Sequence, residues 1–105
     1  MSYVYFWEYE VDPTHAAEFE ALYGPSGEWV ELFRSSPGYL RTELHRDRDH
    51  PHRFVTIDYW ESAQAWQEWR AKVEVEYEEL DRRAARLTVT EREIGRFDLT
   101  GNGRG

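Results

Sequence analysis

Hydrophobic and polar residues alternate along the first segment of the chain. In residues 3–11, YVYFWEYEV, one face collects four aromatic rings and an aliphatic residue: Tyr3, Tyr5, Trp7, Tyr9 and Val11. This period of two, in a segment rich in aromatic and β-branched residues, predicts a β-strand. The run Asp12-Pro13-Thr14 ends it, and Asp12 or Thr14 is expected to cap the helix that follows.

Apolar residues at three- and four-residue spacing then predict helices. The first is expected from His15 to Tyr23, and Gly24-Pro25-Ser26-Gly27 interrupts it. Ser26 is the expected cap of a second piece, which precedes the stop signal at 35–38. A longer stripe predicts one continuous helix from Glu61 to near Leu87, through these positions: Trp66, Trp69, Val73, Tyr77, Leu80 and Ala84.

Three further strands complete the pattern, at residues 39–47, 53–60 and 88–97. The first two are expected to form an antiparallel hairpin. The order βαββαβ predicts an α+β fold, a ferredoxin-like sandwich whose four-stranded antiparallel sheet carries helices on one face. Residues 1–98 are expected to form a single domain, and the Gly-rich residues 99–105 a flexible C-terminal tail.

One face of such a sheet has no helical cover. Leu40, Leu44, Val55 and Ile57 cannot all be buried by a single helical layer. An identical sheet is the simplest cover, so a homodimer is expected.

Composition excludes several classes of function. The formal charge of −8, from 21 acidic and 13 basic residues, disfavours binding to nucleic acid or to anionic membranes. There is no cysteine, and the N-terminal sequence has no signal-peptide pattern. A cytoplasmic protein is therefore expected.

Aromatic residues are unusually abundant, at 16% of the chain. They suggest a broad pocket for a flat ligand, an interface with another chain, or both. No phosphate-binding loop or Ser-His-Asp order is present, and His50 and His52, which flank Pro51, look like a surface turn rather than a metal site.

Four segments resemble the antibiotic biosynthesis monooxygenase family: Trp7-Glu8-Tyr9-Glu10-Val11-Asp12-Pro13, Tyr23-Gly24-Pro25-Ser26-Gly27-Glu28-Trp29, Pro37-Gly38-Tyr39-Leu40 and Tyr59-Trp60-Glu61-Ser62. The second is similar to a subgroup of bacterial members. The resemblance covers about residues 3–97 and implies a dimeric α+β barrel, in which two sheets pack face to face. It also implies that a ligand sits between the helices and the sheet of each protomer.

The activities that the resemblance implies are mixed. Some members oxidise polycyclic phenols or quinols with molecular oxygen and no metal or flavin, and others degrade haem. The haem branch uses an Asn on the first strand, a Trp on the long helix and a His ten residues later. Here the corresponding positions are Trp7, Trp69 and Glu79, and no His follows His52. We therefore expect no haem and no other cofactor.

The expected function is cofactor-independent oxygenation of a flat phenol or quinol. A small aromatic ligand would be held by ring-bearing residues: Trp7, Tyr9, Tyr23, Trp29, Phe33, Trp66, Trp69 and Tyr77. His45, with an ordinary pKa near 6.5, is the candidate catalytic base, against the alternative of a solvated strand histidine. Three strand carboxylates, Glu43, Asp58 and Glu93, are expected to face the seam between two sheets, where they could pair with Arg41, Arg53 and Arg92.

The alternative is a non-catalytic binding protein or structural homodimer, in which the rings only fill the core. A ring-lined cavity of several hundred Å³ would favour a ligand site, and a closed core would favour packing.

Overall fold

Four strands form one antiparallel sheet in the computed structural model of the chain, which describes residues 2–100. The elements follow in the order β1 (Tyr3–Val11), η1 (Pro13–His15), α1 (Ala16–Tyr23), α2 (Glu28–Phe33), β2 (Tyr39–Arg46), β3 (Arg53–Trp60), α3 (Ala63–Lys72), α4 (Glu74–Ala85) and β4 (Thr88–Asp98). The sheet order is β2-β3-β1-β4, with every neighbouring pair antiparallel. This confirms the predicted ferredoxin-like α+β fold.

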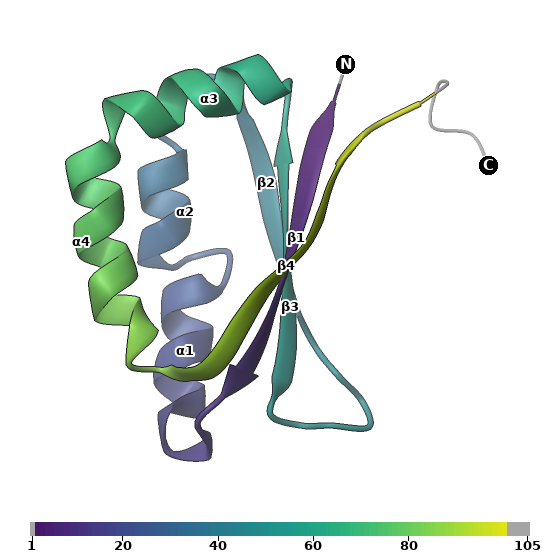
Figure 1. Cartoon of the computed structure of the whole chain (residues 1–105), viewed down its shortest axis with the longest axis vertical. Coiled ribbons are helices and arrows are strands. Elements are labelled where there is room, and N and C mark those ends of the chain that lie inside the picture. Colours follow the sequence, from purple (N-terminus) through teal and green to yellow (C-terminus); the bar gives the residue numbers. More distant parts are fainter. Residues whose placement is uncertain (1, 101–105) are drawn as a thin grey trace.

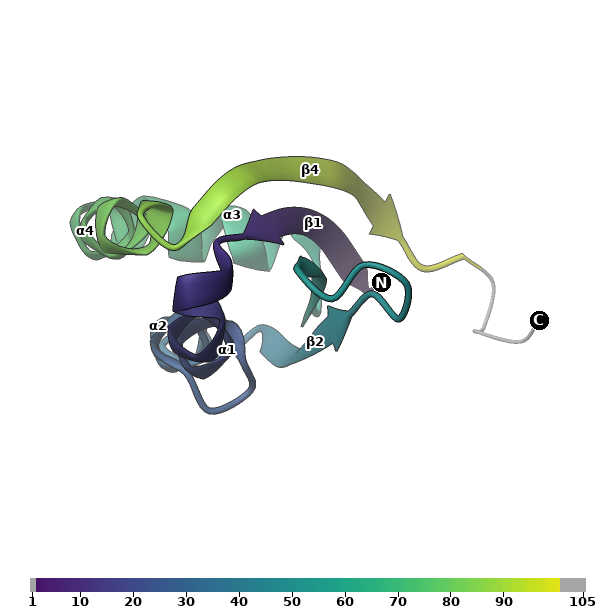
Figure 2. The ribbon, with the colours of Figure 1, turned by 90° about the horizontal axis from the view of Figure 1, so that it is seen from below.

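All the helices lie on one side of the sheet, and its other face is uncovered (Figure 1). Seen from below, the sheet is curved and the helices lie together at one end of the view (Figure 2). Among residues 2–100, no helix is long and apolar enough to cross a membrane.

Strand parity decides which side chains meet the helices. In β3, residues Phe54, Thr56, Asp58 and Trp60 are buried, and the residues between them are only partly buried. In β1 the predicted face is confirmed, because Tyr3, Tyr5, Tyr9 and Val11 are buried on the helix side. Two adjacent strands therefore present large rings to the same layer of helices.

The core beneath the helices is mostly aromatic. Phe19 of α1 is fully buried, and its ring stacks on Tyr23 with centroids 4.3 Å apart. Trp60 of β3 is also fully buried and meets Phe33 at 5.7 Å and Trp69 at 5.2 Å. Each such pair adds about 0.5–1.5 kcal/mol beyond the burial of its area.

The prediction of one continuous helix from Glu61 to near Leu87 is wrong, because this segment forms two helices. Val73, with φ −107° and ψ 24°, separates α3 from α4. Hydrogen bonding continues through the break, from Val73 N to Trp69 O at 3.0 Å and from Tyr77 N to Val73 O at 2.7 Å. In Figure 1, α3 crosses one end of the sheet and α4 turns down beside it. The bend allows both Trp69 and Leu80 to be buried.

The helix caps were predicted in part. Asp12 caps the 3-10 turn and accepts a hydrogen bond from Thr14 N at 3.0 Å. Ser62 caps α3 through Ala65 N, also at 3.0 Å. Ser26 does not cap α2, because Gly27 occupies that position and is buried against the end of α1.

The predicted C-terminal tail begins after β4. The backbone N–H of Leu99 donates to Ser2 O at 2.9 Å. The first residue of the predicted tail is therefore hydrogen-bonded to the residue before β1. The remainder of the predicted tail, 101–105, lies outside the described residues.

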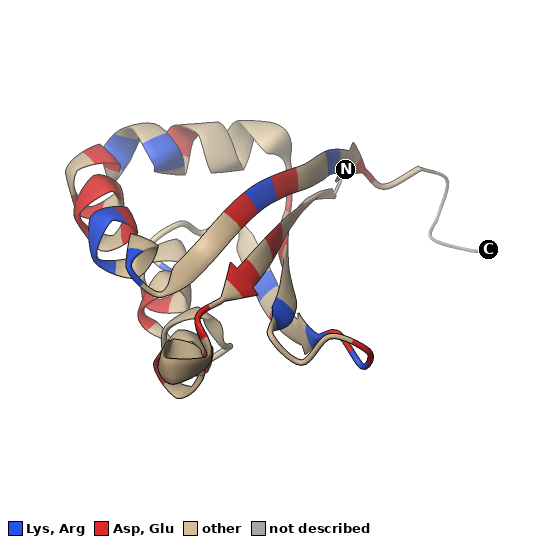
Figure 3. Ribbon diagram, turned by 60° about the horizontal axis from the view of Figure 1, so that its bottom comes forward, with Lys and Arg blue, Asp and Glu red and all other residues tan. Residues whose placement is uncertain are grey.

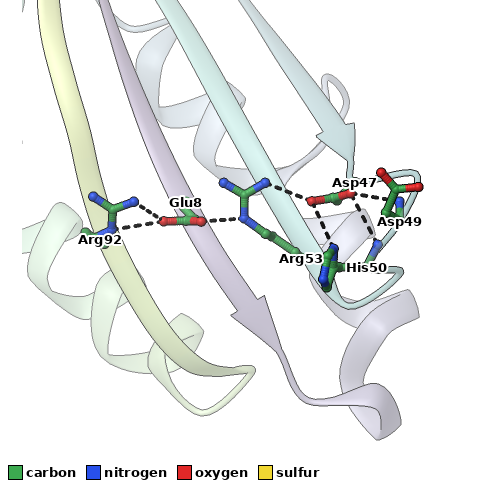
Figure 4. A network of polar contacts seen from close by, with 6 residues as sticks. All are labelled: Glu8, Asp47, Asp49, His50, Arg53 and Arg92. Carbon is green, nitrogen blue, oxygen red and sulfur yellow. Dashed lines mark hydrogen bonds and ion pairs between the residues drawn. The ribbon is translucent and has the colours of Figure 1, made fainter.

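The uncovered sheet face is part apolar and part charged. Val55 and Ile57 lie on it, as predicted, but Leu44 lies opposite Thr56 and packs against the core on the helix side. The charged part crosses all four strands or their ends: Arg92 binds Glu8, Glu8 binds Arg53, and Arg53 Nη1 donates to Asp47 Oδ2 at 2.9 Å (Figure 4).

Acidic and basic residues also alternate along part of β4, and both kinds are frequent in α4 (Figure 3). Of the ion pairs predicted for the sheet, Arg41 and Glu43 do form one, at 3.1 Å. Glu93 instead binds Arg96, whose Nε lies 2.9 Å from its carboxylate.

Candidate functional site

A small cavity lies between the helices and the sheet, as the resemblance implied. Its volume is about 60 Å³. All four strands and three of the helices contribute to its wall: Tyr5, Trp7, Tyr9, Tyr23, Trp29, Phe33, Thr42, Thr56, Asp58, Tyr77, Asp81 and Glu91.

Six of the eight predicted ring-bearing residues line this cavity: Trp7, Tyr9, Tyr23, Trp29, Phe33 and Tyr77. Strand alternation brings Trp7 and Tyr9 to the helix side of β1, and the helical spacing of Trp29 and Phe33 turns both towards the sheet. Trp29 meets Tyr77 edge to face, with centroids 5.1 Å apart. Tyr23 links Tyr9 and Trp29, with ring centroids 4.9 Å and 6.0 Å away, so these rings form a connected part of the wall.

The other two predicted residues lie outside this wall. Trp66 packs against Tyr3 and Tyr5, with centroid distances of 6.1 Å and 6.0 Å. Trp69 is buried, and its indole N–H donates to Leu32 O at 2.9 Å. Each packs against a wall residue: Trp66 contacts Tyr5, and Trp69 contacts Phe33 with ring centroids 5.3 Å apart.

Asp58 is the buried carboxylate of the cavity, with 5% of its surface exposed. Its Oδ1 accepts a hydrogen bond from Thr42 Oγ1 at 2.5 Å, and Thr42 Oγ1 lies 2.8 Å from the Tyr39 hydroxyl. Burial raises the pKa of Asp58 to about 7, while the hydrogen bond from Thr42 acts in the opposite direction. The predicted position of Asp58 at the seam between two sheets is wrong, because its strand parity is that of Phe54 and Trp60.

Other hydroxyl groups lie near this carboxylate. Thr56 Oγ1 donates to the Tyr9 hydroxyl at 3.4 Å. Burial raises the pKa of both Tyr5 and Tyr9 well above that of an ordinary phenol, so both stay protonated at neutral pH. The indole N–H of Trp29 is buried and has no hydrogen-bond partner among the described residues. The cavity therefore combines apolar walls with a few polar groups.

The mouth of the cavity is acidic. Asp81 of α4 and Glu91 of β4 are exposed at its edge. Burial, and then the charge of Asp81, raise the pKa of Glu91. Beside them, the Arg70 guanidinium lies over the Tyr77 ring, 3.7 Å from its centroid.

His45 does not lie in this cavity. It pairs with Val55 in the register of β2 and β3, and so occupies the uncovered sheet face. Its ring Nε2 lies 3.1 Å from Glu43 Oε1, and 59% of its side chain is exposed.

Several wall residues were not predicted: Tyr5, Thr42, Thr56, Asp58, Asp81 and Glu91. A signal for Asp58 and Thr56 was present in the sequence, because both alternate in step with Phe54 and Trp60. No comparable signal existed for Asp81 or Glu91, which reach the cavity only through the placement of α4 and β4.

The cavity is smaller than the several hundred Å³ typical of a ligand site. Its volume corresponds to about two water molecules in the liquid. A bicyclic ligand therefore requires movement of the wall, and Trp7 and Tyr77 are its only partly buried rings.

Comparison with solved structures supports the fold over nearly the whole chain. SnoaB from Streptomyces nogalater, described as a cofactor-independent oxygenase, superposes with a TM-score of 0.78 at 21% identity, covering 99% of this chain and 98% of that one. A mutant form of SnoaB gives a TM-score of 0.80 at the same identity and coverage. A Bordetella bronchiseptica protein named for antibiotic biosynthesis monooxygenases gives 0.74 at 18% identity, covering 94% and 97% of the two chains.

Among curated proteins, no sequence matches the chain. A sequence model of the family described as "Antibiotic biosynthesis monooxygenase" matches residues 2–76. That span runs from β1 to the first turn of α4 and includes most of the cavity wall. The chain therefore belongs to the antibiotic biosynthesis monooxygenase family.

Proposed function

We propose that the protein is a cofactor-independent oxygenase that converts a flat aromatic phenol or quinol to a quinone. The observation that carries this proposal is the ring-lined cavity between the helices and the sheet, with one buried carboxylate in its wall. Structural similarity to SnoaB, named a cofactor-independent oxygenase, gives further support.

The chemistry needs little from the protein beyond binding and proton transfer. A phenol that loses its proton becomes an electron-rich anion, which can give electrons to molecular oxygen. With a phenol, one oxygen atom becomes the second quinone carbonyl and the other leaves as water; with a quinol, one oxygen atom enters as a ring hydroxyl of a hydroxyquinone and the other again leaves as water. The ring itself supplies the electrons, so the balance requires no external reductant.

Cavity residues would divide these tasks. Trp7, Trp29 and Tyr77 offer ring faces for a planar substrate, which favours stacked or edge-to-face contacts. The unpartnered Trp29 N–H is available to a substrate oxygen. His45, the base predicted from sequence, lies on the other face of the sheet. Loss of turnover in His45→Gln would support that prediction, and retained turnover would leave proton removal to a group in the cavity wall.

Oxygen consumption by the purified protein tests the proposal, with naphthols, anthrones and quinols as candidate substrates. Uptake should depend on the protein, and Trp7→Ala should reduce it by about tenfold or more because a wall of the site is lost. Trp66→Ala should have a smaller effect, since Trp66 acts through Tyr5. The absence of uptake with every compound would refute the proposed reaction.

The second candidate function is a non-catalytic binding or structural homodimer. The small volume of the cavity favours it, because closely packed rings can serve the core alone. In either case we propose a second copy of the chain on the uncovered sheet face, where Phe6 meets Phe97 at 5.5 Å and Phe97 is 50% exposed.

A further inference from the structure

Asp58 is a buried carboxylate with no ion-pair partner among the described residues, unlike the partly buried carboxylates Glu8 and Asp47. Glu8 is held by Arg53 and Arg92, and Asp47 by Arg53 (Figure 4). Asp58 is more buried than either, yet among the described residues its only hydrogen-bond donor is Thr42. Burying an ionised carboxylate without a countercharge lowers the free energy of unfolding, and the cost disappears only when the group holds a proton. Its presence at such a site therefore suggests a function.

No positive charge compensates Asp58 from the cavity wall. The lining residues include two further acids and no Lys, Arg or His. The titratable groups around Asp58 are phenols or acids from several elements: Tyr5 and Tyr9 of β1, Tyr23 of α1, Tyr39 of β2, Tyr77 and Asp81 of α4, and Glu91 of β4.

A purely structural role explains this arrangement less well. Thr42 needs an acceptor, but an amide oxygen at position 58 would serve without a buried charge. Placing a proton acceptor in an aromatic wall has a direct chemical use, because a substrate hydroxyl stacked between rings would otherwise have nothing to ionise it.

We propose that Asp58 is the proton acceptor for the substrate hydroxyl group in this cavity, an inference that rests on the proposed function. In this step the O–H bond of the phenol breaks and its electron pair stays on the phenolate oxygen. The proton forms a new O–H bond with the Asp58 carboxylate, so the total charge of the site is unchanged. Thr42 donates to the ionised carboxylate and, in that state, accepts from Tyr39.

The same wall defines the substrate class. Asp81 and Glu91 at the mouth oppose the entry of an anion. Arg70 of α3, the cation beside them, lies over the Tyr77 ring and is not among the lining residues. The substrate enters as an un-ionised phenol that carries no carboxylate or sulfonate group.

Asp58→Asn tests the role of Asp58, because the amide retains an acceptor for Thr42 and a similar volume. In wild type, kcat should rise with pH through about 7, where Asp58 ionises. The variant should lose this rise and fall by about 100-fold or more in kcat. Thr42→Val is a second variant: it removes the hydrogen bond that lowers the pKa of Asp58, so the rise should move to higher pH.

A binding experiment separates this inference from the oxygenation reaction. At pH 8, quenching of tryptophan fluorescence should show 2-naphthol binding about tenfold more tightly than 2-methoxynaphthalene, because only the naphthol donates to a charged carboxylate. This preference should vanish in Asp58→Asn, and 3-hydroxy-2-naphthoate should bind more weakly than 2-naphthol.

Each result has a distinct meaning. The same preference for 2-naphthol in Asp58→Asn as in wild type, or an unchanged kcat and pH profile, would overturn the role of Asp58. Tighter binding of the naphthoate would overturn the proposed substrate class. A wild type that prefers 2-naphthol but consumes no oxygen with any phenol would overturn the oxygenase function while supporting the contact with Asp58.

Discussion

At the scale of the residue, the buried carboxylate of Asp58 lowers the stability of the fold when it is ionised, and the proposed chemistry needs that ionised form. Burial raises its pKa from the ordinary 3.8 to about 7. Its folded-state pKa therefore exceeds the unfolded one, and the folded chain holds a proton at pH values where the unfolded chain has released it. The stability that this proton contributes is fully present below about pH 4 and is lost as pH rises through about 7.

Asp58→Asn should therefore stabilise the protein at pH 8, because it removes a buried charge and keeps an acceptor for Thr42. The gain in the free energy of unfolding should be on the order of 1–4 kcal/mol and should shrink towards zero as pH falls to about 4. Urea unfolding at several pH values measures it. Asp49→Asn, at an exposed turn, is the matched control and should change stability little at any pH.

A stability difference that stays constant between pH 4 and pH 8 would contradict the pKa of about 7 for Asp58. A variant that is both more stable and less active would fit the common observation that active-site residues lower the stability of the fold.

At the scale of the element, the join between α1 and α2 depends on Gly27. A Cβ at this position would overlap the Leu22 carbonyl oxygen and lie only 2.5 Å from that of Ala21. Both oxygens belong to the backbone, which cannot move aside as a flexible side chain can. The absent side chain therefore allows α2 to begin directly against the end of α1, and α2 carries Trp29 and Phe33 to the cavity.

Gly27→Ala should consequently destabilise the fold by about 1–3 kcal/mol, the usual cost of overpacking. Thermal unfolding followed by circular dichroism measures the change. Ser26→Ala is the neighbouring control: Ser26 is exposed and caps nothing, so its effect should stay within about 0.5 kcal/mol. Equal effects of the two substitutions would show that the close approach at Gly27 does not matter.

Sequence patterns predicted these elements well where one period dominated. Alternation fixed the strands at 3–11 and 53–60, and both agree with the structure. The break at Val73 could not be seen in this way, because Val73 is apolar and fits the helical stripe from Trp66 to Ala84. The break is seen only in the folded chain, where Trp69 before it and Leu80 after it are both buried.

At the scale of the whole molecule, the uncovered sheet face exposes apolar side chains that no helix covers. Ile57 lies on it, between Phe6 of β1 and Glu43 of β2 in the strand register. The proposed second copy would bury this apolar area. The network of ion pairs from Arg92 through Glu8 and Arg53 to Asp47 would fix the orientation of the two copies.

Ile57→Asp should shift a wild-type dimer to monomer, because it places an unpaired charge in the centre of the proposed interface. Sedimentation equilibrium measures the mass of each species. Val75→Asp on α4, where Val75 is 74% exposed, should leave the dimer intact. A monomeric wild type at micromolar concentration would contradict the proposed assembly.

The candidate site was predictable in its walls but not in its chemistry. Ring residues such as Trp7 and Trp29 follow from face and spacing, so they could be placed on the helix side from sequence. Asp81 and Glu91 lie far along the chain from the strand that carries Asp58, and they meet it only in the folded structure. The face that His45 occupies depends on the sheet register, which its spacing does not reveal.

The most direct test of the central claim is the fate of molecular oxygen labelled with ¹⁸O. Purified protein, treated with a chelator and supplied with a naphthol that it consumes, should form a quinone that contains one ¹⁸O atom, with the second label in water. Trp7→Ala and Asp58→Asn should form much less of it. A quinone free of label, or no quinone from any phenol offered, would contradict the assignment of cofactor-independent oxygenation to this cavity.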